Sequence, residues 1–143
     1  MARVINLNNI GTERKRLAKS VVIALRELMK QQSLDASTHD LAAYISLALY
    51  EIFKTVDQSV TAWEKRGYWL KADRFRLQWE WSEVESDKMK NALFTDDWAV
   101  VALVSARVAE KLSDVEVSKR HRLGTPWVGA WDHLKEVGEE HGR

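Results

Sequence analysis

Apolar side chains recur at steps of three and four residues through most of this chain, and this spacing constrains its fold more than any other feature. Leu17, Val21, Leu25 and Leu28 form the first such series. Such a series lies on one face of an α-helix, because the helix turns by about 100° per residue. The single proline and six glycines also favour helices. The sequence therefore predicts an all-α fold.

Five helices are expected from the apolar series and from the breaks between them. Gly67 can take the left-handed conformation that ends the second helix, and Thr95 can cap the fourth. Thr125 can cap the last helix, with Pro126 at its first position. The expected helices cover residues 13–31, 39–66, 69–92, 96–112 and 126–137, with a basic linker over 113–125.

Short connections favour antiparallel neighbours, so the predicted architecture is an up-and-down four-helix bundle with a C-terminal arm that ends in the short fifth helix. Ser37 and Asp40 resemble a capping box at the start of the second helix. No internal repeat or change of composition divides the 143 residues, which is about the length of one domain. We therefore expect residues 1–143 to form a single helical domain.

The composition excludes several kinds of chemistry. The chain has no cysteine, so disulfides, thiol nucleophiles and cysteine-bound metals are ruled out. It shows neither an export signal at its N-terminus nor an uninterrupted apolar stretch of about 18 residues. We therefore expect a cytoplasmic protein that does not span a membrane. The net charge of +1 gives no indication of a nucleic-acid partner.

The motifs of the common enzymes that act through a metal, a phosphate-binding loop or a serine nucleophile are missing. No Glu-x-x-His pair of the di-iron bundles occurs, nor a His-Glu-x-x-His, a phosphate-binding glycine loop or a Gly-x-Ser-x-Gly. No catalytic residue, cofactor or metal ligand is therefore expected, and an enzymatic activity is not favoured.

The third expected helix is unusual because its apolar side chains fall on two opposite faces. Charged residues fill the flanks between these faces, so the helix needs a packing partner on each side. One face carries Leu70, Leu77, Trp81 and Val84, and the face about 180° away carries the interface candidates Tyr68, Ala72, Phe75 and Trp79. Aromatic faces bounded by charge are typical of interfaces.

The preferred interpretation is a non-enzymatic helical bundle that acts through protein–protein interaction, by self-association through the third helix or with another helical protein. The chain contains seven tryptophans, and large rings can also simply fill a thin core. Trp127 and Trp131 could cover the second face from within the same chain, in which case no partner is needed.

A basic segment before the last helix suggests a different function, the binding of anions or nucleic acid. Helix N-termini and guanidinium groups bind phosphate, and a neighbouring ring can stack on a base. The anion-binding candidates are Lys119, Arg120, His121, Arg122, Thr125 and Trp127. This alternative requires the fold to bring residues 119–122 close to the basic cluster at 14–19. Nucleic acid is less favoured, because four basic residues form only a short patch.

A second alternative is a small-molecule or enzymatic pocket within the bundle. Tryptophans would line such a pocket, and Arg74 or Arg76 would polarise it. Burial of either arginine without an acidic partner would favour this alternative.

Overall fold

The computed structural model describes residues 7–140, except for the side chains of 139 and 140, and all regular elements in this part of the chain are α-helices. The predicted all-α fold is thus confirmed. The helices are α1 (Leu7–Met29), α2 (Ala36–Lys65), α3 (Trp69–Trp79), α4 (Trp81–Phe94), α5 (Trp98–Lys111) and α6 (Ala130–Glu140).

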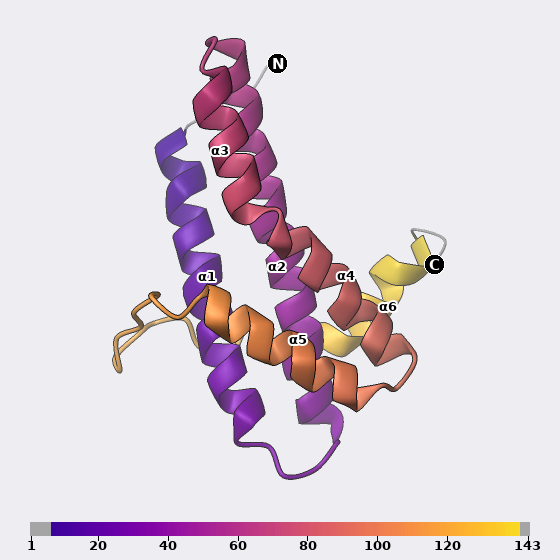
Figure 1. The fold of residues 1–143 in the computed structure, drawn as a ribbon. Helices are drawn as coiled ribbons and strands as arrows, with labels where there is room; N and C mark the ends of the chain where they lie inside the picture. The colour runs from indigo at the N-terminus through magenta and orange to yellow at the C-terminus, as the bar shows by residue number, and fades with distance from the viewer. Residues whose placement is uncertain (1–6, 141–143) are drawn as a thin grey trace.

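The long helix α2 is the centre of the fold, and α1, α3, α4 and α6 all pack against it. Figure 1 shows α1 and α2 running side by side, with α3 and α4 following one another along α2. From the end of α4 the chain turns back, and α5 crosses toward α1. Residues 112–129 then pass α1 before α6 packs on α2.

The apolar series of the sequence becomes the core around α2. Of the series predicted for the first helix, Leu17, Val21 and Leu25 are buried and Leu28 is partly buried. Aliphatic side chains of α2 and α5 are buried with them, as is Met89 of α4. Full burial of one such aliphatic side chain stabilises the fold by about 1.5–3 kcal/mol. The central members of this core are Val21, Leu25, Leu41, Ile45, Leu49, Ile52, Val104 and Val108.

Two buried serines join α2 to α4. The hydroxyl of Ser46 donates to the backbone carbonyl of Ser86 at 2.8 Å, and the hydroxyl of Ser86 donates to the carbonyl of Ser46 at 2.7 Å. Small side chains at this crossing let the helices come close, and each hydroxyl is satisfied by the facing backbone. Next to this pair, Glu85 of α4 accepts a bidentate hydrogen bond from Arg107 of α5.

Four helix starts differ from their predicted positions, and those of α2 and α6 lie at Ala36 rather than 39 and at Ala130 rather than 126. The first helix begins at Leu7 rather than at 13, because a single glycine in a helix costs only about 1 kcal/mol and Gly11 does not end it. The fourth predicted helix begins at Trp98, and the carboxylate of Asp97 caps it by accepting from the Val100 amide at 3.2 Å. Thr95 instead ends α4, where its hydroxyl donates to a backbone carbonyl of the preceding turn.

The third predicted helix is divided at Glu80 into α3 and α4. Glu80 keeps right-handed helical torsion angles, with φ −61° and ψ −24°. The hydroxyl of Ser82 donates to the carbonyl of Trp79 at 2.7 Å, a side-chain bond that competes with the helical ladder. Because Glu80 keeps helical torsion angles, a face of α3 continues as the same face of α4.

Candidate functional site

The face of α3 that was predicted to meet a partner is turned toward α2 instead. Ala72 is fully buried, and Phe75 and Trp79 are half-buried against the core, whereas Tyr68 remains exposed. The ring of Phe75 lies 5.0 Å from the ring of Trp63 on α2. As an interface candidate Ala72 was wrong, because the same chain covers it. Its small side chain, which permits close helix packing, was the signal in the sequence.

The opposite face of α3 and α4 is the one left exposed. Leu70 is 63% exposed, Leu77 66% and Val84 46%, and we call these three residues the outer stripe. They stand seven residues apart, so they form a narrow line along the helix. Trp81 lies next to this line but is half-buried.

Exposed charged residues follow the outer stripe on both sides. At about 100° per residue, three acids lie on one flank, together with Arg76, which is ion-paired with Asp73, and two unpaired bases of the described chain lie on the other. The acidic row consists of Asp73, Glu80 and Asp87, and the basic row of Arg74 and Lys88.

The basic segment at 119–122 lies in an exposed connection and makes local contacts. The amide of Arg120 donates to the Ser118 hydroxyl, and the amide of Leu123 donates to His121 Nδ1. Thr125 and Pro126 do not start a helix, since α6 begins only at Ala130. The predicted helix N-terminus beside the basic residues was therefore wrong. Trp127 is half-buried against the core rather than presented to solvent.

The N-terminus of α6 is capped by a residue far away in the sequence. The carboxylate of Asp40 on α2 accepts from the Gly129 amide at 3.1 Å and from the Trp131 amide at 2.9 Å. Asp40 does not form the predicted capping box with Ser37, because Asp35 caps α2 by accepting from the Thr38 amide. The amides that would have bound an external anion thus already bind a carboxylate of the chain.

The cavity bordered by the first basic cluster is not lined by the second. Lys15 and Lys19 of the first cluster border a cavity, and the linker contributes Asp114 and Glu116 to that cavity rather than residues 119–122. Arg16, between the two lysines, points elsewhere and forms an ion pair with Glu13.

Neither arginine proposed to polarise a pocket is buried. Arg74 is exposed, and Arg76 forms ion pairs with Glu64 at 2.8 Å and with Asp73 at 2.7 Å. Arg14 of α1 has the expected property instead. Among residues 7–140 it forms no ion pair, although it is half-buried.

Arg14 reaches from α1 across to α2. Its Nε donates to the Thr55 hydroxyl at 3.1 Å, and its Nη2 donates to the Thr55 carbonyl at 3.1 Å and to the Ser59 hydroxyl at 2.7 Å. The guanidinium carbon lies 4.7 Å from the centre of the Phe75 ring. Burial lowers the pKa of Arg14, but an arginine stays charged at any physiological pH. A positive charge is therefore held in place without a carboxylate.

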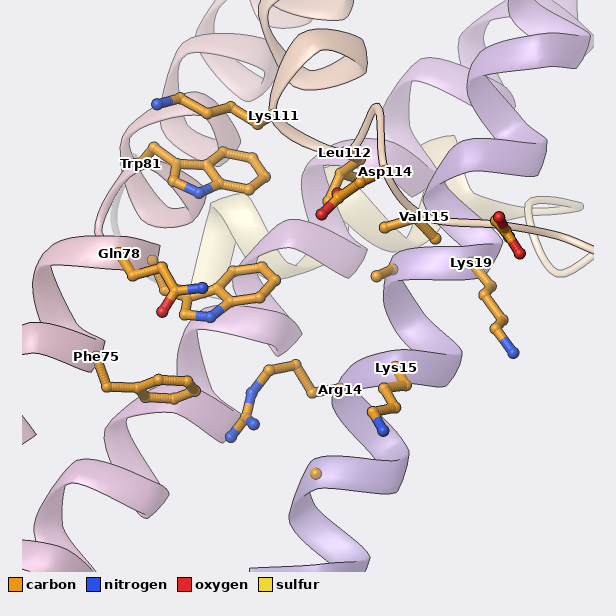
Figure 2. Close-up of a pocket in the computed structure, with 14 residues that line it drawn as sticks. Arg14, Lys15, Lys19, Phe75, Gln78, Trp81, Lys111, Leu112, Asp114 and Val115 are labelled. Carbon is orange, nitrogen blue, oxygen red and sulfur yellow. The ribbon is translucent and has the colours of Figure 1, made fainter. Parts of the chain in front are cut away.

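Arg14 lines a cavity of about 530 Å³ between α1, the α3–α4 pair and residues 111–116, which we call the interhelical pocket. It exists because α1 and α3 both pack on α2 and diverge from one another, while the chain after α5 closes one end. Figure 2 shows Phe75 and Trp81 on one wall and Arg14 extending from α1 toward Phe75. The volume is in the range of small-molecule sites.

The walls of the interhelical pocket differ in character. The rings of Trp79 and Trp81 are stacked, with centroids 5.8 Å apart, and continue the row begun by Phe75. The cations at the pocket outnumber the acids, and in the described part of the chain none of these charges is in an ion pair. The cations are Arg14, Lys15, Lys19 and Lys111, and the acids are Asp114 and Glu116.

A second hollow, of about 500 Å³, lies between the end of α1 and α5. Its lining includes Leu28, Met29 and Trp98 together with small side chains of α5, and contains no charged residue. Within residues 7–140, no group of three or more His, Asp or Glu is placed to hold a metal ion. None of the described helices combines the length and the apolar character needed to cross a membrane.

No protein-family model, curated protein or solved structure matches this chain.

The sequence analysis named the kinds of residue that form the outer stripe and the interhelical pocket, but it did not place them correctly. Arg14 was predicted only as part of the basic cluster at 14–19, since nothing in the spacing shows that it would reach Thr55 and Ser59. Trp81 was grouped with the outer stripe, although it also borders the interhelical pocket. Asp114 and Glu116 gave no signal, because they lie in a connection without periodicity.

Proposed function

We propose that this chain is a non-enzymatic helical-bundle protein that acts through protein–protein interaction, and that its partner is a second copy of itself. In this proposal α1, α2, the α3–α4 pair and α5 are the four helices of an up-and-down bundle, and residues 112–140 are its arm. The lack of cysteine supports a cytoplasmic location. The observation that carries the proposal is the outer stripe, with its charged rows on opposite flanks.

The outer stripe offers exposed apolar area that a second copy could cover. Burial of a whole leucine side chain contributes about 2 kcal/mol, so covering Leu77, of which about two-thirds is exposed, contributes about 1.3 kcal/mol per copy. A two-fold pair buries the same residue twice. Removal of Leu77 from both copies therefore costs about 2.5 kcal/mol, or roughly 70-fold in the dissociation constant.

The charged rows favour one orientation of the pair. In a parallel two-fold arrangement the acidic row of each copy faces the basic row of the other, and Asp73 lies level with Arg74 of the second copy. In an antiparallel arrangement the acidic rows would face each other and repel. The pattern on this single chain is therefore complementary to itself when the helices run in the same direction.

Sedimentation equilibrium of the full chain and of Leu77→Arg tests the proposal. We expect a reversible dimer for the parent chain and a monomer for the variant at the same concentration. Leu103→Arg is the matched control, because Leu103 on α5 is 57% exposed and off the stripe, and it should leave the dimer intact. A parent chain that is monomeric at several hundred micromolar, or a dimer that only Leu103→Arg dissociates, would overturn the proposal.

Charge reversal separates the two orientations. In a parallel dimer, Asp73→Arg and Arg74→Asp should each weaken association about fivefold, since two exposed pairs of about 0.5 kcal/mol each are lost. The double variant should restore association, because the rows are exchanged in both copies. An antiparallel dimer predicts the opposite for Asp73→Arg, which would strengthen association.

A further inference from the structure

We propose that the interhelical pocket binds a small, planar aromatic ligand that carries a single anionic group. This inference does not depend on self-association, since the outer stripe and the pocket are formed by different faces of α3 and α4. It rests on three features of the pocket: a wall of aromatic rings, the charge of Arg14, and an opening lined by both lysines and acids.

The aromatic wall gives the pocket an apolar side made of three rings, in which Phe75 is tilted by 56° from Trp79. Phe75, Trp79 and Trp81 follow one another with centroid separations of 6.4 and 5.8 Å, and the two indoles are tilted by only 23°. A planar ring system can stack on such rings or meet their edges. Aliphatic ligands would leave this surface poorly covered, so the wall favours an aromatic one.

Arg14 supplies the fixed charge beside Phe75, at one end of this wall. The three hydrogen bonds to Thr55 and Ser59 engage Nε and Nη2, and in the described structure no partner is bonded to Nη1. A guanidinium that is oriented by neutral groups keeps its charge uncompensated and needs no reorientation to bind an anion. A carboxylate or sulfonate next to Nη1 would complete its hydrogen bonding.

The rim limits the total charge of the ligand. Lys15, Lys19 and Lys111 attract anions, but Asp114 and Glu116 lie at the same opening and would repel a chain of phosphates. Nucleic-acid sites usually present positive charge along a whole face without acids among it. One anionic group close to Arg14 fits this arrangement, whereas a polyanion does not.

Isothermal titration calorimetry with 2-naphthoate and its neutral analogue 2-naphthamide tests the inference on the full chain. We expect naphthoate to bind at least about tenfold more tightly than naphthamide, because only the anion can pair with Arg14. Arg14→Met keeps an unbranched apolar stem and removes the guanidinium charge, so this preference should disappear. Equal affinities of the two compounds for the parent chain would overturn the inference.

Two lysine variants show whether weaker naphthoate binding comes from the pocket itself, rather than from unfolding of the protein or from a change in its net charge. Lys15→Gln changes an exposed rim lysine, and we expect naphthoate to bind about threefold more weakly, so the test stands even if Arg14→Met fails to fold. Lys65→Gln removes the same charge at the end of α2, outside the pocket, and should leave binding unchanged. Equal weakening by both lysine variants would show a nonspecific charge effect and refute the site.

The indole N–H signals in a nitrogen–proton correlation spectrum show where the ligand binds. We expect naphthoate to shift the signals of Trp79 and Trp81, assigned with Trp→Phe variants. A shift confined to Trp98 would place the ligand in the apolar hollow beside α5 and would refute the inference. Tighter binding of oligothymidylate than of naphthoate would refute the restriction to a single anionic group.

Discussion

The contact between Asp40 and the start of α6 makes a sharp prediction, because it joins two segments that are about 90 residues apart. Asp40→Ala removes the acceptor for the Gly129 and Trp131 amides and leaves both without their partner. The fold should remain, since Ala130 and Leu134 stay buried against α2. We expect the substitution to loosen α6 and to lower the free energy of unfolding.

The expected loss of unfolding free energy in Asp40→Ala can be estimated from the contacts that Asp40 makes with α6. Loss of a side-chain cap at a helix N-terminus costs about 1 kcal/mol, and loss of a negative charge at the positive end of the helix dipole adds about 0.5 kcal/mol. The higher helix propensity of alanine within α2 offsets part of this loss of free energy. Asp57→Ala is the matched control for that gain, because Asp57 is an exposed aspartate on the same helix and in no described ion pair.

Urea unfolding and amide hydrogen exchange measure the two parts of this prediction. Relative to Asp57→Ala, Asp40→Ala should be less stable by about 1–2 kcal/mol, and the amides of α6 should exchange faster than those of α2. If the two variants are equally stable and exchange in α6 is unchanged, Asp40 does not hold α6 and the reasoning fails.

Two other residues allow independent tests. Gly67, with φ +81°, links α2 to α3, and since a Cβ there would meet no heavy atom within 4 Å, Gly67→Ala should cost about 1 kcal/mol through backbone strain alone. Urea unfolding should show a smaller loss for Gly67→Asn, and equal losses would contradict this cause. Hydrogen bonds from the Thr38 amide and the Ser33 hydroxyl hold the pKa of Asp35 below its ordinary value of 3.8, so its contribution to stability is present above pH 3.8 and is lost as the pH falls through the lower folded value. Asp35→Asn should therefore flatten the acid limb of a stability–pH curve, and an unchanged limb would show that the hydrogen bonds contribute nothing.

Most of the helical structure could be predicted from the sequence, because it depends on local spacing. The series at steps of three and four gave the buried sides of α1, α2 and α5, and Gly67 ended the second helix as expected. The weakest predictions concerned helix starts. Several residues near a start can cap it, and Asp97 rather than Thr95 was the one used.

The two faces of the third helix show the limit of periodicity. Spacing by itself shows that Leu77 and Ala72 lie on opposite sides, but not which side is covered. That depended on α2, which packs against the side of Ala72 because a small side chain permits a close helix crossing. Leu77 was left exposed as a consequence.

By itself the sequence determined which residues form helices and which of them share a face, since both follow from contacts within a few residues along the chain. The tertiary structure alone decided which face stayed exposed, that Asp40 caps α6, and that Arg14 lies beside Phe75 with no ion pair to the described residues. These outcomes depend on distances between segments tens of residues apart. Such distances are set by the packing of whole helices, and helical spacing within one segment carries no information about them.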